Sequence, residues 1–291
     1  MDGTTTAAFT LGTMLDSGGE ADIYRVMRHP DLLLKVFRTA PLAEDRRRID
    51  RIIVRRDRAL DAVAAWPQGW VQMGGRSALV LPFVTGAHAI HVLFDRVSWI
   101  GPFPNATWAF MVEVARGAAL AVAAIHAAGL AVVDISEKNM LVARHGRVTV
   151  IDCDSFVFIG EGAASISACY SAGWPPPELA LRLTREPRTA NHDNFSLARL
   201  IFQLLFAGRA PLEPPPGRSP EDPQRVFGFS QIHRVRRPIP GDVALTDLPP
   251  RVAGYFERAF ALPGTHAELR PTAQAWADAL TEMLSALQPC G

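Results

Sequence analysis

Short apolar runs separated by turn residues dominate the first part of the chain. Two of these runs flank Asp-Ser-Gly-Gly at 16–19, a pattern typical of a β-hairpin. Apolar residues at helical spacing within 43–65 predict one helix. The runs that predict strands are 11–15, 23–27, 32–37 and 77–84. We therefore expect a β-rich region interrupted by a single helix.

The pattern becomes helical further along the chain. A nearly all-apolar, Ala-rich stretch covers 108–128, and such a helix needs burial on most sides. Two short strands are predicted at 140–143 and 148–151. Further helices are predicted at 193–207, 251–262 and 272–287. The expected fold class is α+β and bilobal, with a small antiparallel β lobe at 1–84 and a larger helical lobe at 85–291.

Composition narrows the class of protein. The chain has 291 residues, 48% of them hydrophobic and 20% charged, which is typical of globular proteins. A net charge of +1 argues against nucleic acid as a partner. The apolar stretch 117–133 is interrupted by His126 and Gly129, so we expect it to be too short to span a membrane. Three widely spaced cysteines favour a reducing, cytoplasmic location: Cys153, Cys169 and Cys290.

Polar residues gather around the two short strands. Asp134 and Asn139 lie five residues apart before the first strand, and Asp152 follows the second strand, eighteen residues after Asp134. Carboxylate and amide oxygens are ligands for hard divalent cations, and a further carboxylate can accept a hydroxyl proton. The alternative is that Asp134 and Asn139 only cap the loop. Asp154 competes with Asp152 as the metal ligand.

Seven motifs in order resemble the protein kinase superfamily over most of the chain. They are a glycine-rich loop at 16–24, the strand lysine Lys35, the catalytic-loop pair Asp134 and Asn139, the metal aspartate Asp152, Pro177-Glu178, Asp193 opening a buried helix, and Arg270. The sequence Asp-Cys-Asp-Ser-Phe at 152–156 is similar to a bacterial branch of kinase-like proteins. That branch often occurs with metal-dependent phosphatases or von Willebrand A-type proteins, which the resemblance suggests as partners.

The resemblance implies an ATP- and Mg²⁺-dependent enzyme that acts on a protein Ser or Thr hydroxyl. It assigns Asn139 and Asp152 to Mg²⁺, Lys35 to the α- and β-phosphates, and Asp134 to the hydroxyl proton. Lys138 would balance charge on the transferring phosphoryl group. The nucleotide would be covered and enclosed by Gly18, Gly19, Ile23, Leu81, Phe83 and Val84, with Pro82 lacking an N–H donor in the hinge.

Four departures from the family pattern bear on activity. Asp16 and Ala21 replace the first and third loop glycines. Val132-Val133 replaces His-Arg, which removes the partner of a phosphorylated activation loop. Ser136 stands where a lysine is usual, so Lys138 is expected to take over that role. Asp-Cys-Asp replaces Asp-Phe-Gly at 152–154; Cys153 is too small to fill a phenylalanine pocket alone, and Asp154 is expected to keep the turn.

The acidic partner of Lys35 stays open between Asp50 and Glu44, which lie fifteen and nine residues further along. Each could instead pair with the arginines at 46–48. The eroded glycine loop also leaves a second hypothesis, a nucleotide-binding pseudokinase that acts as an interaction module. A kinase acting on a small molecule is the third.

Overall fold

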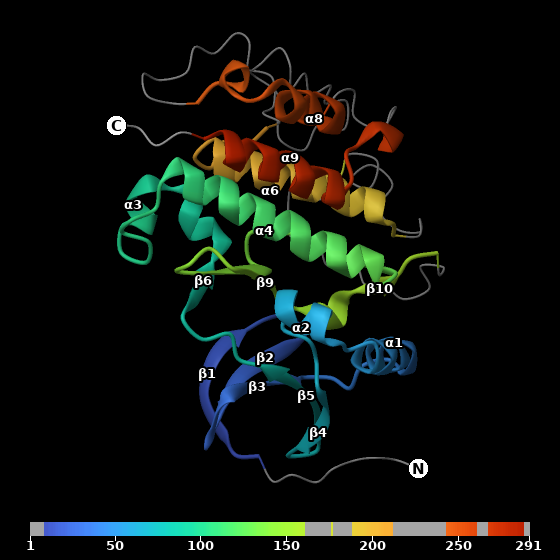
Figure 1. The fold of residues 1–291 in the computed structure, drawn as a ribbon. Helices are drawn as coiled ribbons and strands as arrows, with labels where there is room; N and C mark the ends of the chain where they lie inside the picture. The colour runs from blue at the N-terminus through green and yellow to red at the C-terminus, as the bar shows by residue number, and fades with distance from the viewer. Residues whose placement is uncertain (1–8, 161–175, 177–187, 212–242, 261–266, 288–291) are drawn as a thin grey trace, which may run out of the picture.

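The computed structural model describes residues 9–160, 176, 188–211, 243–260 and 267–287. A five-stranded sheet forms one lobe, and the long helices form the other (Figure 1). The predicted α+β, bilobal architecture is therefore confirmed. The call on Pro177-Glu178 and those on Cys169 and Cys290 lie outside the described residues.

The sheet of the small lobe is antiparallel, in the order β1-β2-β3-β5-β4. Its strands are β1 (Leu11–Ser17), β2 (Ala21–Val26), β3 (His29–Phe37), β4 (Gly69–Met73) and β5 (Arg76–Pro82). All four predicted strands are present, and β4 is an additional one. Because side chains alternate along a strand, Leu34 and Val36 enter one small core while Leu33 and Phe37 enter the other, which includes Ile49 of the following helix. Lys35 therefore projects from the face that meets this helix.

The predicted single helix at 43–65 is two helices, α1 (Ala43–Val54) and α2 (Arg58–Val63). The side chain of Asp57 caps α2 by accepting a hydrogen bond from the backbone N–H of Leu60 at 2.8 Å, so the chain restarts a helix there. After α2, the N–H of Ala65 donates to the carbonyl of Val150 in the helical lobe at 2.8 Å. Trp66 is buried and donates to the carbonyl of Ile52 at 2.8 Å. These bonds connect the C-terminal end of α1 to the larger lobe.

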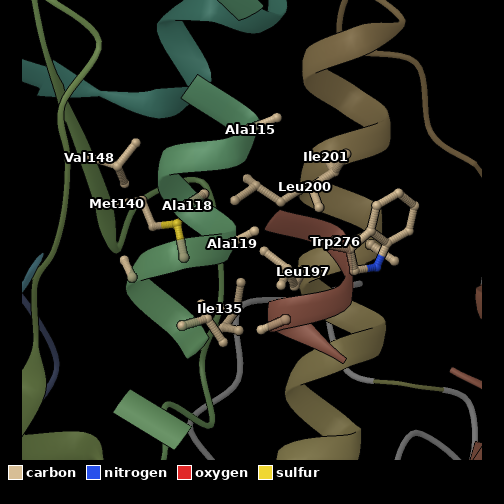
Figure 2. Packing of buried hydrophobic residues seen from close by; sticks show 14 of the residues in the cluster. Ala115, Ala118, Ala119, Ile135, Met140, Val148, Leu197, Leu200, Ile201 and Trp276 are labelled. Atoms are coloured by element: carbon tan, nitrogen blue, oxygen red, sulfur yellow. The ribbon is translucent and has the colours of Figure 1, made fainter. Parts of the chain in front are cut away.

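The core of the larger lobe is formed by α4 (Trp108–Ala127) packed against α6 (Ala190–Leu205) and α9 (Ala273–Ala286), with α8 (Pro250–Phe260) beyond them (Figure 1). Small side chains on α4, such as Ala115 and Ala119, allow Leu197 of α6 and Trp276 of α9 to pack closely (Figure 2). By length and composition alone, α4 could cross a membrane; it begins at Trp108, before the stretch 117–133 that was considered from the sequence. Half of its most apolar window is buried within the lobe, which accounts for its composition.

Two small sheets bracket the polar residues of the predicted site. One consists of β6 (Ala87–Ala89), β8 (Met140–Ala143) and β9 (Val148–Val150), and the other of β7 (Leu130–Ala131) and β10 (Val157–Phe158). Short helices complete the described chain: η1 (Ile90–Phe94), α3 (Arg96–Trp99), η2 (Cys153–Ser155), η3 (Leu245–Asp247) and η4 (Ala267–Leu269). The predicted boundary between the lobes at 84 and 85 falls between β5 and β6 and remains a proposal. The helix α2 precedes this boundary but contacts α4 and β9 of the larger lobe.

Candidate active site

Asp193 of α6 holds the loop that follows β7. This buried carboxylate accepts hydrogen bonds from the N–H groups of Val132 at 2.7 Å and Val133 at 3.0 Å, and it contacts Nε2 of His126 at 2.9 Å. Val133 has φ of 72°, a region that costs a β-branched residue free energy. The two backbone bonds to Asp193 hold it there, which presents the next residue, Asp134, to the cleft between the lobes.

Asp134 and Asn139 are in direct contact. The Nδ2 group of Asn139 donates to Oδ2 of Asp134 at 2.8 Å and to its backbone carbonyl at 3.1 Å. The carbonyl of Asn139 also accepts from the N–H of Ile151 at 2.9 Å, which connects this loop to the segment after β9. Asn139 thus closes the loop through its nitrogen, while its amide oxygen is the atom that could serve a metal ion. Loop capping and metal binding are compatible here.

Asp152 begins a tight turn after β9. It has φ of 61° and ψ of 39°, and its carbonyl accepts from both the N–H and the Oγ of Ser155. Its Oδ1 lies 2.5 Å from Nζ of Lys35, and 37% of its side chain is exposed to the cleft. The left-handed conformation expected in this segment belongs to Asp152 and not to Asp154.

Lys35 has a second carboxylate partner, Asp154, whose Oδ2 lies 2.8 Å from Nζ. Neither acid proposed on α1 makes this contact in the described structure. Asp50 is half exposed, accepts from Nε1 of Trp70 at 2.8 Å, and lies 3.5 Å from Arg46. Glu44 is exposed in the first turn of α1. The acids that hold Lys35 therefore come from the turn at 152–154.

The cluster of Lys35, Asp152 and Asp154 contains more acidic than basic groups. Burial by itself would lower the pKa of Lys35, but Asp154 and Asp152 together outweigh it and raise the pKa above its ordinary value. Burial raises the pKa of Asp154, with Asp152 adding to the effect and Lys35 opposing it. With both acids ionised, one ammonium faces two carboxylates, which leaves one negative charge in excess. That excess favours a bound cation.

Cys153 and Phe156 fill the space behind the turn. Cys153 is fully buried and packs as a small hydrophobic residue, and burial raises the pKa of its thiol. Phe156 is also fully buried and meets the edge of Trp66 with ring centroids 5.9 Å apart. These two rings occupy the interface where Cys153 alone is too small.

A cleft of about 450 Å³ opens beside these groups. Among its lining residues are Gly19, Lys35, Asp134, Asp152 and Asp154. The other nucleotide-enclosing residues predicted from the sequence do not line it: Gly18, Ile23, Leu81, Phe83 and Val84. The backbone N–H of Phe83 donates to the carbonyl of Asp31 at 2.7 Å, so it is engaged within the small lobe. Lys138 is exposed and does not line the cleft either.

Several residues that line the cleft were not predicted from the sequence, among them Arg38, Asp45 and Arg48. Arg38 donates to Ser17 and Asp22 at 2.6 Å each, and its hydrogen bond lowers the pKa of Asp22. These bonds connect the glycine-rich hairpin to the end of β3. No pattern in the sequence separates Arg48 from its neighbours Arg46 and Arg47, because the difference depends on which face of α1 meets the turn.

The oxygen ligands available here fit a magnesium ion for which the protein provides only some of the ligands. Asp152 offers a partly exposed carboxylate, Asn139 an amide oxygen, and the cluster an excess negative charge. The described part of the chain contains no group of three or more His, Cys, Asp or Glu side chains able to hold a metal. Magnesium commonly binds through one or two carboxylates together with waters and substrate phosphates, so this set is sufficient.

The small antiparallel sheet, the helical lobe and the polar groups between them define a bilobal, protein-kinase-like fold. Comparison with known proteins agrees, although no family model matches the chain. The chain is 32% identical over 296 residues to the protein named Protein kinase YegI of Escherichia coli strain K12, an alignment covering 97% of the chain and 45% of that protein. The homonymous protein of E. coli O157:H7 is equally identical, with 46% of its length covered. The chain spans about half the length of these curated relatives, and they support a relationship to protein kinases.

Proposed function

We propose that this chain transfers the γ-phosphoryl group of ATP to a Ser or Thr hydroxyl of a protein, in a Mg²⁺-dependent reaction. The observation that supports this most is the convergence of Lys35, Asp134 and Asp152 on one cleft, with Asn139 bonded to Asp134. These residues come from three separate segments of the chain. The kinase-named relatives support the same class of reaction.

Each group has a role that follows from its position. Lys35 keeps its proton and would orient the α- and β-phosphates. Asp134, oriented by Asn139, would accept the proton of the substrate hydroxyl. Asp152 and the amide oxygen of Asn139 would hold Mg²⁺, which neutralises charge on the phosphate oxygens when bound. Gly19 would approach the phosphates through its backbone.

Lys138 is proposed to balance charge on the transferring phosphoryl group. Of the 30 basic side chains in the sequence, two are lysines, Lys35 and Lys138, and all the others are arginines. A lysine is a compact point charge on a flexible stem, whereas arginine is a planar fork, so the two are not interchangeable at a reacting centre. Lys138 is exposed on the loop that carries Asp134, and its long side chain can turn toward the cleft.

The adenine is proposed to lie against Ile23 and Leu81, with backbone contacts from the segment at 82–84. Pro82 has no N–H, and the N–H of Phe83 is bonded to Asp31. The carbonyl of Pro82 and the N–H of Val84 are therefore the groups that we assign to the adenine edge.

A pseudokinase that acts as an interaction module is the second candidate. The observation that favours it is the hairpin at 16–22, where side chains of Ser17, Asp22 and Arg38 bond to one another and replace part of a glycine-rich cradle. No observation on the described residues favours the third hypothesis, a kinase that acts on a small molecule. The comparisons give no support to a phosphatase or von Willebrand A-type partner.

The test is a radiolabel transfer assay with ATP and Mg²⁺, using the chain itself and a mixture of acidic and basic proteins as acceptors. We expect label on Ser or Thr with the wild type and none above background with Asp152→Asn. Asp50→Asn is the matched control, since it makes the same change on an exposed acid outside the cleft. ATP binding without any transfer would favour the pseudokinase.

A further inference from the structure

The helix α1 contributes an arginine to the turn, and none of its own acids contacts Lys35 in the described structure. The Nη1 group of Arg48 donates to the backbone carbonyls of Asp154 and Phe156, the latter at 2.8 Å. Its Nη2 group lies 3.2 Å from Asp45, three residues before it on the same helix. Arg48 therefore connects α1 to the segment that carries both acidic partners of Lys35.

We propose that Asp154 is the carboxylate that fixes Lys35 in position, and that Arg48 is a positioning residue that holds the turn bearing Asp154. This inference rests on the proposed function for its kinetic consequence, but the ion pair itself can be tested without any activity. Lys35 is thus held by an acid of the turn instead of the expected acid on α1. The helix α1 supports this turn through Arg48, which donates to two of its backbone carbonyls.

Burial divides the two carboxylates that Lys35 contacts. The side chain of Asp154 is 7% exposed, whereas that of Asp152 is 37% exposed. A metal ion entering from the cleft can reach Asp152 without displacing protein groups. Asp154 also lines the cleft, but its side chain is nearly buried, and the ammonium of Lys35 lies 2.8 Å from its Oδ2 and compensates its charge. When Asp152 is engaged by a metal ion, Asp154 would still hold the ammonium of Lys35.

The geometry of Arg48 suits this supporting role. Two carbonyls that are two residues apart in the chain accept from one guanidinium nitrogen, and a third contact to Asp45 fixes the same group. A guanidinium presents several donors in a fixed plane, which a lysine cannot reproduce. A displacement of α1 would therefore loosen the turn and release Asp154 from Lys35.

The two lysines make the ion pair directly observable. Protein labelled with ¹⁵N-lysine should give two side-chain ammonium signals, one from buried Lys35 and one from exposed Lys138. In the wild type we expect the Lys35 protons to exchange with water at least tenfold more slowly than those of Lys138, because the ammonium is buried and hydrogen-bonded. Lys35→Met assigns the signals. This measurement requires no variant of Asp154 that might fail to fold.

Asp154→Asn and Asp50→Asn then distinguish a partner in the turn at 152–154 from a partner on α1. We expect Asp154→Asn to shift the Lys35 signal and to speed its exchange, and Asp50→Asn to leave both unchanged. Fast exchange of Lys35 in the wild type, or a response to Asp50→Asn instead of Asp154→Asn, would overturn the inference. These outcomes do not depend on phosphoryl transfer, so an inactive wild type would contradict the proposed function alone.

Steady-state kinetics test the part played by Arg48. We expect Arg48→Met to lower kcat/KM for ATP by roughly 10- to 100-fold, the scale of losing a charge-assisted hydrogen bond, with KM for the protein substrate unchanged. Arg48→Lys should recover part of the loss, and Arg47→Met, on the exposed face of α1, should match the wild type. If Arg48 has a purely structural role, Arg48→Met should lower the apparent kcat by the same factor when either ATP or the protein substrate is varied. That result, or full activity of Arg48→Met, would overturn the assignment.

Discussion

Asn139 donates a hydrogen bond from Nδ2 to Oδ2 of Asp134 at 2.8 Å, and a second one to the carbonyl of Asp134 at 3.1 Å. A neutral amide thereby fixes the orientation of the carboxylate that we propose as the general base. Nδ2 donates to this carboxylate, and the ionised carboxylate is the form that can accept a proton.

Replacement of Asp134 should therefore affect the chemical step much more than binding. We expect Asp134→Asn to lower phosphoryl transfer by roughly 10²- to 10⁴-fold, since general-base assistance operates mainly in the transition state. Calorimetry should show ATP affinity within a few-fold of the wild type. Unchanged turnover would remove Asp134 from the mechanism.

Substitutions of Asp152 and Asp154 should affect the Mg²⁺ dependence of nucleotide binding differently. We expect Asp152→Asn to remove the Mg²⁺-dependent part of nucleotide binding, because its carboxylate is the one exposed to the cleft. Asp154→Asn should retain the dependence on Mg²⁺ while weakening nucleotide binding at every Mg²⁺ concentration. Calorimetric titrations with and without chelator measure both. The reverse pattern would mean that the register of the turn has been misassigned.

The local patterns of the sequence predicted four of the five strands of the small-lobe sheet and the long helices of the larger lobe. The apolar run at 32–37 predicted a buried strand that carries a single lysine. The long apolar helix at 108–128 was predicted within one residue of α4. The break between α1 and α2 was missed because it depends on the cap supplied by Asp57, within a stretch where arginines and aspartates alternate with apolar residues.

The candidate site could be predicted only where its residues are close in sequence. The spacing of Asp134, Asn139 and Asp152 predicted one polar site, and in the structure Asp134 and Asp152 line the cleft while Asn139 is bonded to Asp134. The partner of Lys35 could not be found in this way, because it depends on how α1 is rotated against the turn at 152–154. Asp154 was considered as a metal ligand and as a turn residue, but its contact with Lys35 joins residues 119 positions apart.

Asp193 should matter for stability as much as for activity. Its buried carboxylate accepts from two backbone N–H groups and contacts His126, so Asp193→Ala leaves these donors without a partner. We expect the free energy of unfolding to fall by about 3–5 kcal/mol. Urea denaturation followed by circular dichroism measures this. Asp278→Ala, on the exposed face of α9, should change stability by less than about 0.5 kcal/mol. Equal effects of the two variants would contradict the anchoring role.

Lys138 provides the sharpest test of transfer itself. Ser136, at the position where a lysine is usual, is fully buried, and its Oγ has no hydrogen-bond partner among the residues that the structure describes. A charge placed at position 136 would be buried, so we expect Ser136→Lys to destabilise the protein. We therefore propose that Lys138, on the exposed side of this loop, provides its cation.

We expect Lys138→Met to lower the single-turnover rate by roughly 10²- to 10³-fold, the scale of losing one preorganised electrostatic contact in the transition state. Nucleotide affinity should change little, because Lys138 does not line the cleft of the described structure. Lys138→Arg keeps the charge but changes its shape and should retain more activity than Lys138→Met. Arg144→Met is a suitable control, since it also removes one charge, from the hairpin between β8 and β9. If Lys138→Met transferred phosphate as fast as the wild type, Mg²⁺ and Lys35 would have to balance the charge without it, and the role proposed for the second lysine would be excluded.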